Sequence, residues 1–250
     1  MSARQLKGFL KWGAARIGVD IRSARHTEAA VLQSVLQRLQ PAAVADVGAN
    51  VGQYGRRVRA AGFKGPLVSF EALEDAHRRL TTAAARDPNW IVAPRAALGS
   101  REGTVTLNIA ANRASSSVLP LTGLLQAAAP EASYVGRQET PVARLDSLSS
   151  LFPPGRIFLK VDTQGYELEV LRGATALLPR IVGMQLELSL VPLYDGAPSM
   201  ADVLLYTRTQ GYELFQLVPG LRDERDGRLL QAEGFFVQAP SRGADCAGLA

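Results

Sequence analysis

A short apolar strand that ends in an acid and runs into a glycine-rich turn constrains this chain most. It is the stretch Val44-Ala45-Asp46-Val47-Gly48-Ala49-Asn50-Val51-Gly52. The apolar residues around and after the turn recur at helical spacing, namely Val51, Tyr54, Val58 and Ala61. This periodicity predicts a helix from about Gly52. Glycines let the backbone approach a ligand closely, and the free N–H groups of a first helical turn face it. The stretch therefore predicts a strand–turn–helix cradle for a nucleotide or nucleoside.

The spacing of this turn differs from the dinucleotide-binding fingerprint. Gly48-x-Asn50-x-Gly52 stands where that fingerprint has Gly-x-Gly-x-x-Gly. Asp46 would repel a pyrophosphate and would attract a positively charged ligand group, such as the amino group of an amino acid. S-adenosylmethionine has such an amino group and a sulfonium, and it has no phosphate. The alternative is a glycine-punctuated strand–helix junction that only packs.

Length and composition fit one globular α/β domain. The chain has 250 residues and no apolar run of bilayer length. The single cysteine, Cys246, excludes an internal disulfide and a cysteine metal cluster, and only two histidines, His26 and His77, exclude a His-rich metal site. The net charge of +5 comes without a basic stripe interleaved with aromatic residues, so we expect no nucleic-acid partner.

The N-terminal segment is basic and amphipathic. Residues 4–17 predict a helix that either packs across the domain as a flap or makes weak contact with a membrane surface. Lys11 and Arg16 interrupt its apolar residues, which is unlike a cleaved signal, and we therefore expect a cytoplasmic protein.

Strand and helix patterns alternate along the rest of the chain. Helices are expected at about 27–39, 52–61, 75–86, 168–178 and 199–210. Strands are expected at 44–47, 67–71, 90–92, 104–109, 141–145, 157–161, 184–190, 212–218 and 234–237. This order predicts an α/β fold with a doubly wound, mostly parallel sheet and two closing strands.

The expected boundaries give three parts. Residues 1–40 form an N-terminal helical extension, 41–240 form the main domain, and 241–250 form a disordered tail. Within the main domain, we expect 104–109 to pair with 141–145 as an inserted hairpin added to the core sheet.

Glu71 stands at the end of the second expected strand, nineteen residues after Gly52. Doubly wound folds place a carboxylate at this point, where it accepts hydrogen bonds from ribose hydroxyls. The alternative is a surface acid that caps the next helix.

The strand at 157–161 carries charge at its carboxyl end. Lys160 and Asp162 point to the same face and lie at the edge where open α/β sheets bind ligands. Lys160 would keep Asp162 ionised, although the two residues also suit a purely structural ion pair. Glu187, in the strictly alternating strand 184–190, is either a carboxylate of the same site or a solvated edge residue.

Together these motifs resemble the FkbM family of S-adenosylmethionine-dependent methyltransferases, which have a Rossmann-like fold of the class I type. The resemblance spans about 42–238 and rests on Asp46 to Gly52, Ser69-Phe70-Glu71, Ala114-Ser115-Ser116-Ser117, Leu145-Asp146-Ser147-Leu148, Leu159 to Glu167, Gln185 to Leu188 and Tyr194. One departure is Ala72, where the family commonly has proline. The resemblance implies an O-methyltransferase that acts on hydroxyls of sugars, glycolipids, polysaccharides or polyketides.

The resemblance also implies where the cofactor binds. It assigns the methionine end to Asp46, Gly48, Asn50 and Gly52, the ribose to Glu71, the adenine to Ala97 and its neighbours, and the methyl group to the vicinity of Asp162.

Methyl transfer to an alcohol needs a base or a metal, because an alcohol is weakly acidic. Asp162 and Glu187 are the candidate general bases, with Lys160 as the residue that orients them. The two carboxylates could instead share a divalent cation through oxygen ligands. His26 and His77 are expected to be ordinary surface or core histidines.

Three other functions compete with this one. A methyltransferase acting on nucleic-acid or protein nitrogen is disfavoured because the Asp/Asn-Pro-Pro-Tyr motif is missing. A nicotinamide oxidoreductase is disfavoured by the turn spacing and by Asp46, and a non-catalytic cofactor-binding scaffold stays open. The segments 111–140 and 191–196 are expected to shape the acceptor pocket.

Overall fold

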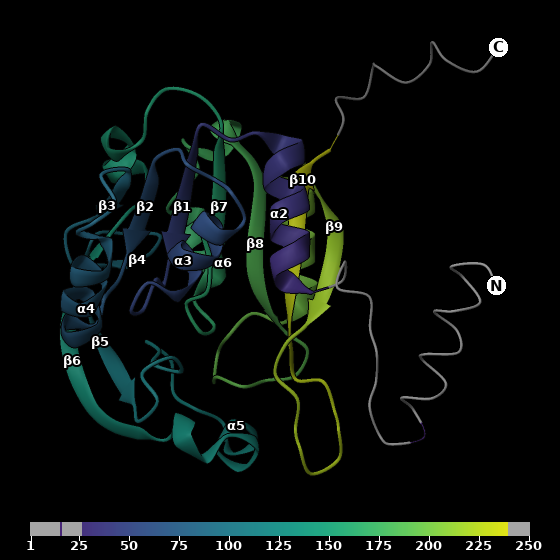
Figure 1. Ribbon diagram of the computed structural model, residues 1–250. Coiled ribbons are helices and arrows are strands. Elements are labelled where there is room, and N and C mark those ends of the chain that lie inside the picture. Colours follow the sequence, from purple (N-terminus) through teal and green to yellow (C-terminus); the bar gives the residue numbers. More distant parts are fainter. Residues whose placement is uncertain (1–15, 17–26, 240–250) are drawn as a thin grey trace.

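A seven-stranded sheet forms the centre of the molecule within the residues described by the computed structural model, which are Arg16 and 27–239. Its strand order is β3-β2-β1-β7-β8-β10-β9 (Figure 1). The strands are β1 (Ala43–Val47), β2 (Leu67–Phe70), β3 (Trp90–Val92), β7 (Ile157–Val161), β8 (Ile181–Ser189), β9 (Tyr212–Pro219) and β10 (Gln231–Gln238). β10 runs antiparallel to β8 and β9, and the other strand pairs of this sheet are parallel. The predicted doubly wound, mostly parallel sheet is therefore confirmed.

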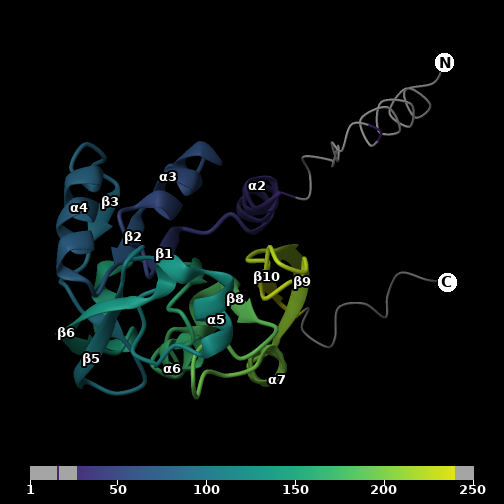
Figure 2. The same ribbon diagram turned by 90° about the horizontal axis from the view of Figure 1, so that it is seen from below.

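Helices cover both faces of this sheet (Figure 2). They are α2 (Glu28–Leu39), α3 (Gln53–Ala60), α4 (Glu74–Ala84), α5 (Gly123–Ala128), α6 (Glu167–Arg172) and α7 (Met200–Thr209). Viewed along the sheet, α2, α3 and α4 lie on one side and α6 and α7 on the other. The core is accordingly divided into two main apolar clusters, one on each side.

The expected helix at 27–39 is confirmed with its cap. The Thr27 hydroxyl accepts the N–H of Ala30 at 3.3 Å, which satisfies one of the free donors of the first turn. The buried side of α2, including Leu32, packs in one cluster with Val44 of β1 and Phe158 of β7. This helix therefore covers the central strands, and the boundary at residue 40 stays a prediction.

A row of buried polar residues crosses the sheet beneath α2 and α3. Ser69 of β2 stands beside Asp46 of β1, Asp46 beside Lys160 of β7, and Lys160 beside Gln185 of β8. Their exposed fractions are 0%, 0%, 5% and 1%. Buried polar groups need hydrogen-bond or charge partners, so the partners of these four residues are described with the site.

The inserted segment forms a sheet of its own. Strand β5 (Gly103–Ala110) pairs antiparallel with β6 (Tyr134–Ala143), with Thr104 opposite Pro141, so the expected pairing is confirmed. The expectation that this pair extends the core sheet is wrong. Its third member is β4 (Ala97–Leu98), which pairs with β6 and gives the order β4-β6-β5. The second neighbour of β6 is therefore the two-residue strand β4, and not a strand of the core sheet.

The helix expected at 168–178 is shorter than its apolar spacing predicts. α6 ends at Arg172, and a 3-10 helix at Leu178–Arg180 precedes β8. At Gly173 a Cβ atom would lie 2.1 Å from the carbonyl oxygen of Gly99, so another stretch of backbone crosses the chain where the helix ends. Glycine allows this crossing and also disfavours helix.

No helix in 27–239 is long and apolar enough to cross a membrane. The expected amphipathic segment 4–17 and the expected tail 241–250 lie outside the described residues, apart from Arg16.

Candidate functional site

The turn after β1 has an unusual backbone. Gly48, Asn50 and Gly52 all have positive φ angles, of 72°, 48° and 84°. Such angles are the left-handed region, which favours glycine and tolerates asparagine. A Cβ atom at Gly48 would lie 1.9 Å from the carbonyl oxygen of Asp162, so the turn after β1 and the loop after β7 meet backbone to backbone. Gly52 is the N-cap of α3, as the periodicity predicts.

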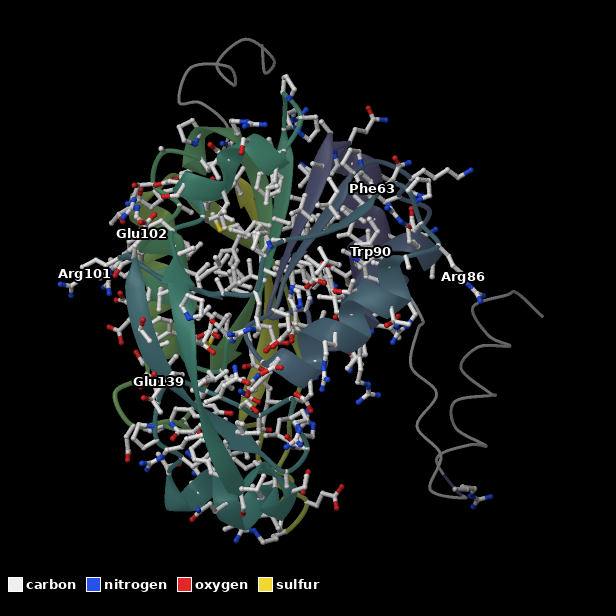
Figure 3. All side chains as sticks on the ribbon, turned by 90° about the vertical axis from the view of Figure 1, so that its left-hand side faces the viewer. Phe63, Arg86, Trp90, Arg101, Glu102 and Glu139 are labelled. Atoms are coloured by element: carbon white, nitrogen blue, oxygen red, sulfur yellow. The ribbon has the colours of Figure 1, made fainter. Side chains whose placement is uncertain are left out.

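Gly52 also packs closely against an aromatic side chain. A Cβ atom there would lie 3.1 Å from the indole ring of Trp90, which reaches under α3 from β3. The indole N–H of Trp90 donates to the Ser69 hydroxyl at 2.9 Å. In Figure 3, Trp90 lies at the right of the view, whereas Arg101 and Glu139 lie at the left, where the small sheet β4-β6-β5 is.

A cavity of about 110 Å³, open to solvent, lies at the carboxyl ends of β1, β2 and β7. The wall is built from the turn after β1, the end of β2, strand β4, the loop after β5 and the loop after β7. Its residues include Gly48, Asn50, Phe70, Glu71, Ala97, Leu98, Arg113, Ser116, Asp162, Gln164 and Tyr166.

The Glu71 carboxylate connects two loops of this wall. Its Oε2 accepts the N–H of Asn50 at 2.7 Å, and its Oε1 accepts the N–H groups of Ala72 and Leu73 at 2.9 and 2.8 Å. Burial raises the pKa of Glu71, while these three donors act in the opposite direction. A carboxylate has about four lone-pair sites, so Oε2 keeps one acceptor site for a hydroxyl in the cavity. This fits the ribose of a nucleoside.

Lys160 lies between two carboxylates. Its Nζ is 3.4 Å from Asp46 Oδ1 and 3.5 Å from Asp162 Oδ2, and it donates to the carbonyl oxygens of Val47 and Gly48 at 3.2 and 3.0 Å. Burial opposes the charge of Lys160, but the charges of Asp162 and Asp46 outweigh it and raise the pKa. Lys160 is therefore a protonated residue that joins the β1 turn to the β7 end.

Asp46 lies one layer below the cavity wall. It is fully buried, and its Oδ2 accepts the Ser69 hydroxyl at 3.2 Å. Burial raises the pKa of Asp46, and Lys160 lowers it. In this structure Lys160 supplies the positive partner that sequence reasoning assigned to a ligand.

The carboxylates of Asp162 and Glu187 are bridged by an amide. Gln164 Nε2 donates to Asp162 Oδ1 at 2.7 Å and to Glu187 Oε2 at 2.9 Å. Tyr194 donates its hydroxyl to Gln164 Oε1 at 2.6 Å. Burial, with the charges of Asp162 and Glu233, raises the pKa of Glu187 well above its usual value.

The predicted site residues divide into two groups. Gly48, Asn50, Glu71, Ala97 and Asp162 line the cavity. The other four do not line it. Lys160 contacts Asp162 of the wall, Asp46 contacts Lys160, and Glu187 contacts Gln164 of the wall, whereas Gly52 packs against Trp90. The roles of the residues in both groups as ligands or catalysts stay predictions.

His77 lies outside the cavity wall. His77 Nε2 is 2.9 Å from the carbonyl oxygen of Ala93, and His26 falls outside the described residues. Among the residues that the structure describes, no group of three or more His, Cys, Asp or Glu side chains has the arrangement of a metal site.

Several wall residues were not singled out from the sequence. Gln164 and Tyr166 lie two and four residues after Asp162, and Ser116 belongs to the serine run at 115–117. The serine run is part of the family pattern, which does not predict its contacts. Arg113, with φ 63°, stands at a turn whose conformation the sequence does not signal.

Comparison with known proteins identifies the family. The model of the methyltransferase FkbM domain matches residues 46–214, which is more than half of the chain. The search of curated proteins gave no match.

Solved structures with a similar fold include three methyltransferases. A putative O-methyltransferase from Klebsiella pneumoniae has 10% identity and a TM-score of 0.49, covering 93% of this chain and 89% of its own. Precorrin-6y C5,15-methyltransferase from Geobacter metallireducens has 12% identity and a TM-score of 0.46, covering 88% and 94%. Aeropyrum pernix fibrillarin, solved with S-adenosyl-L-methionine, has 13% identity and a TM-score of 0.44, covering 78% and 65%.

The family model begins at Asp46, before the glycine turn, and runs through both cavity loops into β9. The chain belongs to the FkbM family of S-adenosylmethionine-dependent methyltransferases.

Proposed function

We propose that this chain is an O-methyltransferase that methylates a hydroxyl of a sugar, glycolipid, polysaccharide or polyketide-type product. The observation that carries the proposal is the position of Asp162. Its carboxylate lines the cavity, is 33% exposed, and contacts both the Lys160 ammonium and the Gln164 amide. Removing the proton of a weakly acidic alcohol requires a base at such a position.

S-adenosylmethionine, when bound, supplies a methyl carbon on a sulfonium as the electrophile. The residues that fit it are those of the cavity wall. The glycine turn at Gly48 allows close approach of a ligand, Glu71 retains an acceptor site for a ribose hydroxyl, and Ala97 and Leu98 give the wall an apolar part.

Asp162 is the best candidate for the base. Lys160 is protonated, because the neighbouring carboxylates raise its pKa, so it holds Asp162 and does not take a proton. Glu187 lies behind the cavity wall, and burial raises its pKa well above the usual value, which favours its protonated form. In this proposal the hydroxyl proton passes to Asp162, while Lys160 and Gln164 hold the carboxylate in place.

A divalent cation is the alternative way to activate the hydroxyl. It would need oxygen ligands from Asp162 and Glu187. Both carboxylates accept hydrogen bonds from the same Gln164 amide group, and Asp162 is also beside an ammonium, so their neighbours are donors that compete with a cation.

The proposal is tested by identifying the product. The purified protein is incubated with methyl-labelled S-adenosylmethionine and extracts of polar lipid, polysaccharide and secreted small molecules from the source organism. The expected result is release of S-adenosylhomocysteine together with a product whose new methyl group is attached to oxygen in its NMR spectrum. A label found on nitrogen or carbon would refute O-methylation, and binding of the cofactor without release in any fraction would favour a scaffold.

A further inference from the structure

Gln164 is held in a strained bend of the loop after β7. Its φ angle is 58°, in the left-handed region that is unfavourable for a residue with a side chain. Glu167 stabilises this bend, because its Oε1 accepts the N–H groups of Thr163 and Gly165 at 2.9 and 3.2 Å. A non-glycine residue persists in such a conformation only where its surroundings determine it.

Every polar atom of the Gln164 side chain has a partner. Nε2 gives its two hydrogens to Asp162 and Glu187, and Oε1 accepts the hydroxyl of Tyr194. Rotating the amide by half a turn would place Oε1 against the Asp162 carboxylate oxygen, which has no hydrogen to donate. The orientation of this amide is therefore determined by its neighbours.

The backbone of Gln164 is clamped as well. The fully buried Ser117 donates its hydroxyl to the Gln164 carbonyl oxygen at 2.7 Å. The hydroxyl of Tyr194 lies 3.2 Å from the carbonyl oxygen of Ser115. The serine run and Tyr194 thus contact Gln164 from two different segments, and neither contact is part of the proposed chemistry.

We propose that Gln164 is a positioning residue of the methyl transfer: it holds the Asp162 carboxylate toward the cavity and couples it to Glu187. This inference rests on the proposed function, in which Asp162 takes the hydroxyl proton. Lys160 holds Oδ2 of Asp162 and Gln164 holds Oδ1, so the two contacts together fix the plane of the carboxylate. A neutral donor between two carboxylates also reduces the repulsion between them.

The first variant is Gln164→Met, which has similar length and no polar group. Its matched control is Gln216→Met on β9, away from the cavity. Calorimetry should give an affinity for S-adenosylmethionine within about threefold of wild type for both. The maximal rate of S-adenosylhomocysteine release, measured with the extract that supports turnover, should fall at least about thirtyfold in Gln164→Met only.

The second variant is Tyr194→Phe, which removes the hydroxyl that orients the amide. Its rate should fall by about three- to tenfold, and the double variant should be no slower than Gln164→Met alone, because Tyr194 acts through Gln164. Additive losses, or a Gln164→Met rate equal to wild type, would overturn the inference.

A third readout is independent of the acceptor. Carboxyl carbon NMR of Glu187, assigned with Glu187→Gln, should show a higher titration midpoint in Gln164→Met than in wild type, because the variant lacks a donor to the charged form. An unchanged midpoint would refute the bridge itself. Absence of turnover in wild type with every extract would instead refute the proposed function and leave the NMR result to decide on the bridge.

Discussion

Glu187 of β8 and Glu233 of β10 lie directly opposite each other in the antiparallel part of the sheet. Opposite residues on one face have Cβ atoms about 5 Å apart, so two half-buried carboxyl groups lie close together beside Gln185, which donates to Glu233 at 2.9 Å. Burial raises the pKa of Glu233 to about 7, with a further contribution from Asp162. The acidic side of the site is therefore sensitive to pH near neutrality.

This pair predicts a pH dependence of stability. A carboxyl with a raised pKa binds its proton more tightly in the folded chain than in the unfolded chain, so the free energy of unfolding falls as the pH rises from about 4.5 to 7. Glu233→Gln removes this titration and should flatten the slope, as measured by urea unfolding at a series of pH values. The exposed Glu213→Gln is the control, and an equal slope in wild type and Glu233→Gln would contradict the prediction.

Lys160→Met should destabilise the fold strongly. It leaves the buried Asp46 carboxylate without its cation, and breaking a buried ion pair costs about 3–5 kcal/mol. Urea unfolding measures the loss. The double variant Asp46→Asn, Lys160→Met should recover part of it, whereas Arg172→Met at an exposed ion pair should cost no more than about 1 kcal/mol. A double variant as unstable as the single one would contradict this reasoning.

Gly48→Ala should disrupt both folding and cofactor binding. The new methyl group would meet the Asp162 carbonyl oxygen at 1.9 Å, in addition to the cost of a left-handed alanine. We expect a loss of more than about 2 kcal/mol and no measurable binding of S-adenosylmethionine by calorimetry. Gly62→Ala separates the two effects, because Gly62 has φ 92° and open space around its Cβ position, so its cost should be about 1 kcal/mol. Equal losses in the two variants would mean that the backbone contact is unimportant.

Asp162→Asn should keep the cofactor and lose the reaction. The amide retains the shape of the carboxylate but cannot take a proton, so turnover should fall about a hundredfold or more, as for other general bases. Calorimetry with S-adenosylmethionine should give an affinity within about threefold of wild type. Full activity in this variant would exclude Asp162 both as base and as metal ligand.

Chelator treatment separates the base from the cation. Since the Gln164 amide and the Lys160 ammonium compete with a cation at these carboxylates, activity should be unchanged after incubation with EDTA and gel filtration. Loss of activity that returns on adding Mg²⁺ or Mn²⁺, with buffer alone as control, would favour the cation.

Much of the fold could be predicted from the sequence because its signals are local. Alternating or continuous apolar runs predict the strands, including β2, which ends one residue before Glu71, and Thr27 predicts the start of α2. The pairing of Lys160 with Asp162 follows from two charges on one face of a strand, and the structure confirms their contact at 3.5 Å.

The rest depends on contacts between distant segments. Nothing near Asp46 in the sequence indicates that Lys160, more than a hundred residues later, lies beside it in the sheet. The early end of α6 depends on Gly99, which crosses the chain at Gly173. The separate small sheet depends on β4, a strand of two residues that is too short to give a periodic signal.

The polar row beneath α2 and α3 has a consequence for how the molecule opens. Side-chain contacts join Ser69 of β2 to Asp46 of β1 and Asp46 to Lys160 of β7, and Gln185 of β8 donates to Glu28 of α2 at 3.0 Å. Separating β2 from β1, or β1 from β7, would leave a charge or a donor unpaired in an apolar interior. Strands β2, β1 and β7 therefore behave as one cooperative unit, whose amides should exchange with solvent only through global unfolding.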